Sequence, residues 1–285
     1  MSTKNFVPEL WDARLMEHLD DALVFKALCN TDYEGEITAQ GNTVHVNQIG
    51  DITISPYAPG KTTITVEHLK SVQTVLTVDQ GHYYAFGVED VDKVQSTPNL
   101  LEQAADRAAF GLGHVIDSYV ANLYTQAGAS ITSHGSTAVN SGNVIGLIGY
   151  VAQLMNENNV PNEGRWGVVP PWFALSLTLA NILKKTDNVD IIKTGYIGSM
   201  PTLGMDFYMS NNVVTTGTAP DYTSYCLFGR KPALTFAQQV LENEAYRSHD
   251  NFSDVVRGLL VYGAKVMDPR QLVSMTAVYT TEINI

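Results

Sequence analysis

The sequence predicts an α+β protein in which a long β-hairpin precedes one long helix. Three observations predict this class. Apolar and polar residues alternate from about residue 42 to residue 88, which is the period of a β-strand. Apolar residues then recur at helical spacing over about 98–127. Beyond Gly128, short helices and strands follow each other to the end of the chain.

Size and composition are those of a globular protein with one large domain or two intertwined ones. Of the 285 residues, 45% are hydrophobic and 16% are charged. No apolar run approaches the ~18 residues of a membrane span, so we expect no membrane partner. The first residues lack the basic start and apolar run of a secretion signal, so we expect synthesis and use in a cytoplasm.

The charge balance argues against a protein that binds nucleic acid directly. There are 17 Lys and Arg against 29 Asp and Glu, a formal net charge of −12. Binding to nucleic acid requires Lys and Arg clusters that neutralise phosphates, and the sequence has no basic run. An acidic wall remains compatible with a container that an external motor fills.

The first segment predicts a helix that must dock on another surface. Pro8 suits a first helical position, and Trp11, Leu15 and Leu19 follow at helical spacing. We expect this helix to end near residues 29–31.

The alternating segment predicts a long two-stranded hairpin. Its turn is the Pro- and Gly-rich stretch 56–60, and each arm of about 15–18 residues would reach ~50–60 Å, with the second arm running on to residue 88. A lone two-stranded hairpin is marginal in water, so one this long needs a surface, which a neighbouring copy could supply. Two ordinary hairpins within one sheet are the alternative.

The strongest local pattern predicts a helix of ~28 residues, about 42 Å long. Ser96 or Thr97 can cap it, and Pro98 fits its first position. Gly111 and Gly113 lie in its middle, where each weakens a helix by about 1 kcal/mol relative to Ala, and they could allow close packing or bending.

The rest of the chain predicts a mixed lobe. We expect helices over about 143–158 and from 170–171 to about 185, a loop-rich stretch over 186–222, and strands at the following positions: 166–169, 207–209, 225–228, 233–236, 255–264 and 272–279.

No motif predicts catalytic, cofactor-binding or metal-binding residues. The pair Gly111 and Gly113 lacks the third glycine of a dinucleotide fingerprint, and the stretch 195–199 lacks the order of a nucleophile elbow. His114 and Asp117 are helical neighbours without a third ligand, so we interpret them as a surface hydrogen bond.

The two cysteines, Cys29 and Cys226, have neither metal-site nor disulfide spacing, and we predict two buried thiols. No cofactor is expected, and we predict that the chain is not an enzyme.

Several segments resemble the coat proteins of tailed bacteriophages with the Hong Kong 97-type fold. They are VPELW at 7–11, NTDYEGEI at 30–37, GNTVHV at 41–46, IGDITI at 49–54, VDQGHYYAFGVED at 78–90 and VYGAKV at 261–266. The order of elements is also similar along essentially the whole chain.

This resemblance implies a division of the chain into four parts. They are an N-terminal arm (1–40), an extended β-hairpin loop (41–81), a peripheral domain with a spine helix at about 98–127 (82–137 and 251–285), and an axial domain (138–250). It also implies a major capsid protein whose hexamers and pentamers form an icosahedral shell around double-stranded DNA in the virion.

The resemblance also implies partners. Because the arm begins almost at Met1, with no room for a fused scaffolding segment, we expect a separate scaffolding protein. A portal protein and an optional decoration protein complete the expected set. Some relatives cross-link neighbours through Lys–Asn bonds, but no motif assigns that role to Lys61 or Lys70.

The functional residues should therefore lie at subunit interfaces. We expect the hairpin tip, with Tyr57, Pro59, Lys61 and Thr63, to lie over an adjacent subunit. Trp11 and Leu15 should fasten the arm to another subunit. Gly111 and Gly113 should let the spine helix bend in an immature shell.

Two other functions stay open. The same fold serves encapsulin-like bacterial compartments that hold a cargo enzyme, although the long arm ahead of the hairpin favours a phage. A soluble oligomeric α/β enzyme is the second alternative, and it predicts a pocket with strongly shifted pKa values.

Overall fold

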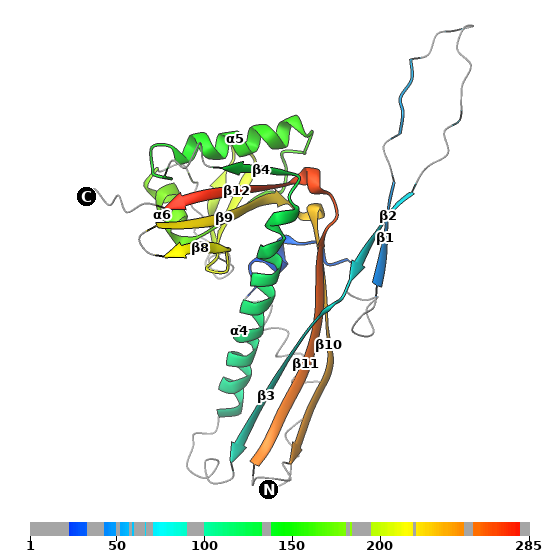
Figure 1. Cartoon of the computed structure of the whole chain (residues 1–285), viewed down its shortest axis with the longest axis vertical. Helices are drawn as coiled ribbons and strands as arrows, with labels where there is room; N and C mark the ends of the chain where they lie inside the picture. The colour runs from blue at the N-terminus through cyan, green and yellow to red at the C-terminus, as the bar shows by residue number, and fades with distance from the viewer. Residues whose placement is uncertain are drawn as a thin grey trace.

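The computed structural model of the chain describes residues 23–32, 43–49, 52–56, 59, 66, 71–89, 100–132, 138–180, 183, 195–218, 221–247 and 253–279. Helices and strands are both present along this length, which confirms the α+β class. Figure 1 shows an elongated lobe below, a second lobe at the upper left, and a hairpin that projects away from both.

The elongated lobe packs one long helix on a three-stranded antiparallel sheet. The helix is α4 (Leu100–Ala121), and the sheet has the order β10 (Leu234–Arg247), β11 (Ser253–Val266), β3 (Gln80–Glu89). Leu112, Ile116 and Val120 recur every fourth residue of α4 and form one buried stripe. They share a core with Leu260 and Tyr262 of β11, which holds the helix to the sheet.

The helix predicted over about 98–127 is confirmed, and its C-terminal turns have the tighter winding of a 3-10 helix. After Ala121, residues Asn122–Gln126 form the 3-10 helix η2. Here Asn122 Nδ2 donates to the carbonyl of Ser118 at 2.8 Å, and Thr125 Oγ1 donates to the carbonyl of Asn122 at 3.3 Å. Such side-chain bonds compete with the α-helical ladder, and 3-10 turns are common where helices end.

The second lobe is built on a seven-stranded mixed sheet. Its strand order is β4 (Ala129–Thr132), β12 (Leu272–Tyr279), β9 (Asp221–Arg230), β5 (Arg165–Val169), β7 (Met205–Met209), β6 (Tyr196–Met200), and β8 (Thr215–Thr218) pairs with β9. The pairs β4–β12 and β5–β7 are parallel, and the other pairs are antiparallel. Helices α5 (Val144–Glu157) and α6 (Pro171–Leu179) belong to the same lobe (Figure 1).

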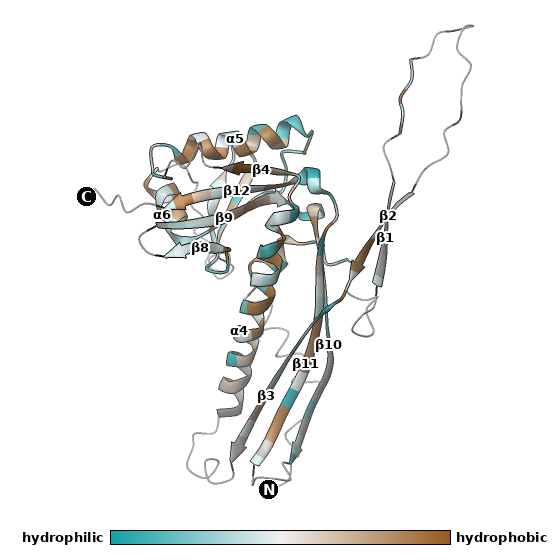
Figure 2. Cartoon of the chain, viewed as in Figure 1, coloured by the Kyte–Doolittle hydropathy of each residue, from teal (hydrophilic) through white to brown (hydrophobic). Residues whose placement is uncertain are grey.

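Both faces of this sheet are covered. On one face, Val169 and Phe228 share a core with Ile148 of α5 and Phe173 of α6. On the other face, Trp166 and its neighbours pack toward α4 and the first described segment. All five residues of β5 are therefore buried, as expected for a central strand covered on both sides. Figure 2 shows that α5 is hydrophobic along most of its length, with hydrophilic residues at its C-terminal end.

The hairpin differs from its prediction in its second arm. β1 (Thr43–Ile49) pairs with β2 (Ser71–Thr77) in antiparallel register, but β3 pairs with β11 and not with β1. The prediction of one arm running on to residue 88 is therefore wrong. Leu76 and Val78 are fully buried in a small core with Val261 of β11, and this burial turns the chain into the sheet.

Strand pairing also departs from the predicted division into domains. β10, placed in the predicted axial domain (138–250), pairs with β11 in the elongated lobe. β4 and β12, placed in the predicted peripheral domain (82–137 and 251–285), lie in the seven-stranded sheet. The chain thus crosses between the two lobes before and after its middle part, and each lobe is built from more than one stretch of the sequence.

The other predicted elements are mostly confirmed. α5 and β5 occupy almost the predicted positions, and β9, β10 and β11 are longer than predicted. The helix predicted from 170–171 to about 185 ends at Leu179 as α6. The first described element, α2 (Phe25–Leu28), ends just before the predicted end of the N-terminal helix.

Candidate interaction surfaces

Most of the predicted interface residues lie outside the described residues. This holds for Trp11, Leu15, Tyr57, Lys61 and Thr63, whose roles stay predictions. Pro59 is described, and it lies exposed in a turn of the hairpin loop, which leaves it free to meet another surface.

The two predicted hinge glycines lie in an unbroken helix. Gly111 is exposed, and a Cβ atom built on it would meet nothing within 4 Å. Gly113 is buried. α4 runs through both without interruption, so the structure places them in the spine and leaves bending as a prediction.

The hairpin loop presents large apolar side chains to solvent. Ile52 is 64% exposed, Ile54 is 94% exposed and Val66 is 77% exposed. β1 and β2 carry this loop away from both lobes (Figure 1). Large apolar side chains on a projecting loop are available for contact, because covering them gains about 25 cal/mol per Å².

The base of the hairpin is fixed firmly to the elongated lobe. Lys265 Nζ of β11 donates to the carbonyl of Val75 at 2.8 Å. A Cβ on Gly263 would lie 2.4 Å from the carbonyl oxygen of Thr77, so only glycine permits this close approach. The projecting loop is thus held at its base by the hydrogen bond from Lys265 and by the small core around Val78.

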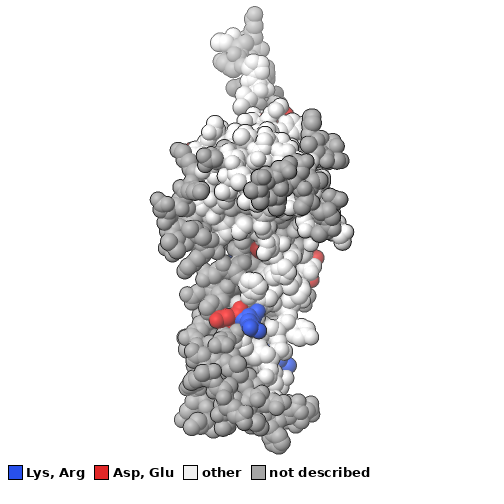
Figure 3. Space-filling view, turned by 90° about the vertical axis from the view of Figure 1, so that its left-hand side faces the viewer, with Lys and Arg blue, Asp and Glu red and all other residues white. Residues whose placement is uncertain are grey.

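A second exposed surface lies on the three-stranded sheet. Tyr83 of β3 is 79% exposed beside a hollow of about 500 Å³ that Tyr246, Arg257 and Leu259 also line. Arg257 pairs with Glu244 at 2.6 Å and lies over the ring of Tyr246, 5.1 Å from its centre. Figure 3 shows that charged side chains are sparse on the described part of one face of the molecule. The described side chains of this surface are aromatic and include the ion pair of Arg257 and Glu244, and such a surface suits protein contact better than nucleic-acid contact.

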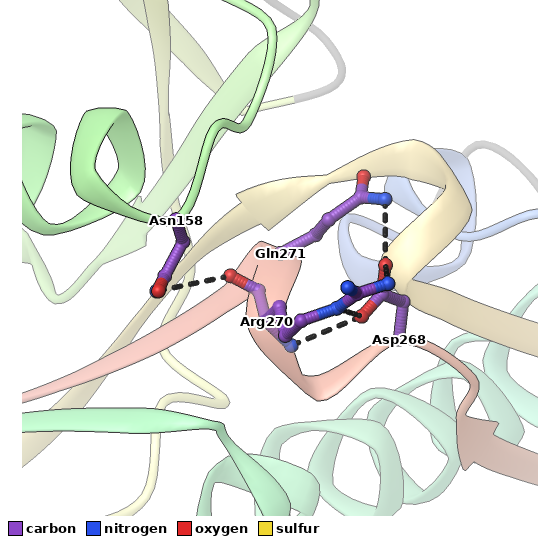
Figure 4. A network of polar contacts seen from close by, with 4 residues as sticks. All are labelled: Asn158, Asp268, Arg270 and Gln271. Carbon is purple, nitrogen blue, oxygen red and sulfur yellow. Dashed lines mark hydrogen bonds and ion pairs between the residues drawn. The ribbon is translucent and has the colours of Figure 1, made fainter. Parts of the chain in front are cut away.

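The corner between the two sheets is held by a compact polar network (Figure 4). Asp268 accepts from the backbone N–H and the Nε of Arg270, each at 3.1 Å, and from Gln271 Nε2 at 2.9 Å. Asn158, just after α5, donates to the carbonyl of Arg270 at 3.5 Å. Burial alone would raise the pKa of Asp268, but the hydrogen bonds from Arg270 and Gln271 hold it below its ordinary value. The carboxylate therefore stays charged and fixes the turn from β11 to β12.

A buried carboxylate joins three separate parts of the chain. Asp117 of α4 is fully buried and accepts from the backbone N–H of Val24 at 3.1 Å, from that of Phe25 at 3.2 Å and from Asn212 Nδ2 at 3.4 Å. We call these four residues the Asp117 junction. It links the first described segment, the spine helix and the loop between β7 and β8.

Burial raises the pKa of Asp117 to about 6, although the hydrogen bonds from Val24, Asn212 and Phe25 and the nearby His114 lower it. The predicted surface hydrogen bond between His114 and Asp117 is wrong. The segment at Val24 covers the carboxylate, and helical spacing alone could not reveal such a cover.

The Asp117 junction borders a hollow of about 490 Å³ but does not form an active site. Phe110, His114 and Met209 also line this hollow. A perturbed carboxyl beside a pocket is what an enzyme would show. Here three N–H groups donate hydrogen bonds to the carboxylate, and the Asp117 residue is fully buried, so the carboxylate is not available to a substrate.

Neither a metal site nor an exposed thiol is found in the part of the chain that the structure describes. No group of three or more His, Cys, Asp or Glu residues there could hold a metal ion. Cys29 and Cys226 are free and buried, as predicted, and burial raises the pKa of both thiols well above the ordinary value. None of the described helices is both long enough and apolar enough to cross a membrane.

Comparison with known proteins decides the family. The model of a family described as phage capsid protein matches residues 71–275, which is most of the chain. The chain belongs to this family. It is therefore a capsid protein, a structural shell subunit rather than an enzyme, and its place is the virion capsid.

Solved structures agree with this capsid assignment. A protein of Mycobacterium phage Che8 is 26% identical, with a TM-score of 0.68 over 89% of this chain and 90% of that one. The capsid structure of the cyanophage P-SCSP1u is 17% identical, with a TM-score of 0.64 over 86% and 85%. These likenesses confirm the Hong Kong 97-type fold that the sequence segments predict.

A more distant likeness concerns the compartment alternative. The holo-SrpI encapsulin complex from Synechococcus elongatus PCC 7942 has a subunit 10% identical to the capsid protein, with a TM-score of 0.59 over 87% of this chain and 86% of that one. At this identity the likeness concerns the fold alone. A search of curated proteins finds no match.

Proposed function

We propose that this capsid protein forms hexamers and pentamers that close into an icosahedral shell around the double-stranded DNA of a tailed phage. The observation that carries the proposal is the family match over 71–275. The net charge of −12 supports a shell that does not hold its DNA by direct binding. The exposed Ile52 and Ile54 support contacts between copies through the hairpin loop.

We propose a matching division of labour within the chain. Residues 1–40 act as the N-terminal arm and residues 41–81 as the extended loop. The elongated lobe acts as the peripheral domain and the lobe around the seven-stranded sheet as the axial domain, with β10 counted in the former and β4 and β12 in the latter. The strand pairing supports this reassignment of β4, β10 and β12.

The loop tip with Tyr57, Pro59, Lys61 and Thr63 would lie on an adjacent subunit, and Trp11 and Leu15 would dock on another. A separate scaffolding protein would set the shell size, a portal protein would admit the DNA, and a decoration protein is an optional addition. Assembly would take place in the cytoplasm of the host bacterium.

Electron microscopy of particles tests the assembly proposal. The chain should be expressed alone and together with the scaffolding protein of the same phage. We expect uniform closed shells only in the second case. Uniform shells of native size from the chain alone would contradict the need for a scaffolding protein. Small discrete oligomers in both cases would contradict shell formation itself.

The contents of native particles separate the phage shell from the compartment. The likeness to the SrpI encapsulin is the observation that keeps the compartment as a second candidate. A phage shell should contain DNA that resists added nuclease. A compartment should instead contain a co-purifying protein and no protected DNA.

A further inference from the structure

We propose that docking of the N-terminal segment 23–30 on the spine helix is linked to proton uptake, so that mild acid fastens the segment and neutral pH loosens it. The inference rests on the geometry of the Asp117 junction and does not depend on the shell. It assigns this capsid protein a pH-sensitive fastening at the root of its predicted arm.

The segment is fastened by two means, and only one of them involves charge. Leu23, Phe25 and Leu28 are buried in the main core, and Asn30 bridges to β10 through backbone bonds of 2.8 Å with Leu234 and 3.0 Å with Phe236. These contacts are insensitive to mild changes of pH. They contribute the same stability at every pH, so the charged contact alone changes how often the segment lifts.

The charged contact is the carboxylate of Asp117, which the segment itself covers. Val24 and Phe25 donate to the two carboxylate oxygens from the covering side. Val24 and Asp117 both line the adjacent hollow, so lifting of the segment removes the cover that Val24 provides and opens the carboxylate further to water. Docking therefore takes a carboxylate out of water and gives it two N–H donors from the segment, beside the one from Asn212.

Removal of a carboxylate from water favours its neutral form, unless nearby charges compensate. The charged or titratable groups facing the junction are few among the described residues. His114 stands one turn earlier on α4 and favours the ionised form. On the segment, the charge of Asp117 raises the pKa of the Cys29 thiol and that of Lys231 lowers it. The buried Lys26 lies on α2. The balance leaves the pKa of the docked Asp117 at about 6 against an ordinary value of 3.8.

The direction of the linkage follows from these two values. A group with a higher pKa in the docked state binds its proton more readily there, so protonation favours docking. The fastening is strongest below the ordinary pKa and weakens as pH rises through about 6. For these two values, the equilibrium for lifting the segment should rise about tenfold between pH 5 and pH 8.

The two cysteines provide a direct readout in the full-length chain. Cys29 lies in the segment and is fully buried, so a thiol reagent reaches it only when the segment lifts. Cys226 is fully buried in the seven-stranded sheet and reports unfolding of that lobe. Labelling with 4,4′-dithiodipyridine across pH 5 to 8, corrected by the rate of a free model thiol, gives the opening equilibrium of each site.

We expect the corrected labelling of Cys29 to rise about tenfold from pH 5 to pH 8, and that of Cys226 to stay constant. Asp117→Asn should abolish the rise, because its side chain does not titrate. Asp206→Asn is the matched control: the pKa of Asp206 is also raised by burial, but it lies on β7 outside the Asp117 junction, so the rise should persist. A flat profile in the wild type, or an unchanged rise in Asp117→Asn, would overturn the proposal.

A second variant decides the matter if Asp117→Asn fails to fold, which fast labelling of Cys226 would reveal. The hydrogen bond from Asn212 lowers the pKa of Asp117. Asn212→Ala should therefore move the midpoint of Cys29 labelling to higher pH and keep the rise. An unchanged midpoint would contradict the role of Asp117.

Discussion

The backbone N–H of Phe25 donates to Oδ1 of Asp117 at 3.2 Å across 92 residues of sequence. This contact supplies a cap that α2 lacks locally, because its N-cap residue Val24 has no side chain that can accept a hydrogen bond. The spine helix thus caps another helix from a distance. The carboxylate of Asp117 thereby fixes the position of Val24 and Phe25 against α4.

Removal of that carboxylate should destabilise the folded chain. Asp117→Ala leaves the N–H groups of Val24 and Phe25 buried without an acceptor, at a cost of about 1–3 kcal/mol. Urea unfolding of the unassembled chain measures the loss. Asp32→Ala, at an exposed residue two positions beyond the segment, should change stability by less than about 0.5 kcal/mol. Equal losses in the two variants would show that the acceptor is unimportant.

Gly263 should be intolerant of even one added methyl group. The new Cβ in Gly263→Ala would lie 2.4 Å from the carbonyl oxygen of Thr77, so the end of β2 must move away from β11. Overpacking of this kind costs about 1–3 kcal/mol. Thermal unfolding should show a clear decrease in Tm. If the variant is as stable as the wild type, the hairpin base is not held as closely as described.

The hinge prediction for the spine helix can be separated from stability. Gly111→Ala meets no atom within 4 Å, so it should stabilise the helix by up to about 1 kcal/mol. If bending at Gly111 and Gly113 serves an immature shell, particles of either alanine variant should expand less readily than wild type. Particle diameters before and after expansion provide the measurement. Normal expansion of both variants would reject the hinge.

Local patterns predicted the elements well, because helical and strand periods are written in neighbouring residues. β12 occupies the predicted residues, and α5 differs from its prediction by one residue at each end. Pairing was less predictable. Burial of Val78 under Val261 of β11 diverts the second arm of the hairpin, and these two residues are 183 positions apart.

The candidate surfaces were predictable only in part, for a related reason. Alternation at Ile52 and Ile54 is visible in the sequence, but a strand buried in a sheet shows the same pattern. Only the fold shows these side chains in solvent. The sequence likewise cannot show that Val24 and Phe25 cover Asp117, since the contact requires both the helix and the segment to be in place.

The predicted arm can be tested through its aromatic residue. Large aromatic side chains at the centre of interfaces commonly contribute ~2 kcal/mol or more on truncation. Trp11→Ala should therefore reduce the yield of closed shells while the lobe around the seven-stranded sheet stays folded, as near-ultraviolet circular dichroism can show. Wild-type assembly by this variant would remove the arm hypothesis.

Ile54 tests whether the exposed loop serves contacts between copies. Its side chain is 94% exposed, so Ile54→Ser removes almost no buried apolar surface, and the free energy of unfolding should stay within about 0.5 kcal/mol of wild type. If a neighbouring copy covers this side chain in the shell, the lost methyl and methylene groups weaken every such contact at ~0.8 kcal/mol per CH₂. Sedimentation should then show fewer closed shells at the same protein concentration. Ser55→Ala, at the next exposed position, should assemble normally because it removes no apolar surface. Equal assembly of Ile54→Ser and wild type would show that the loop does not make the proposed contact.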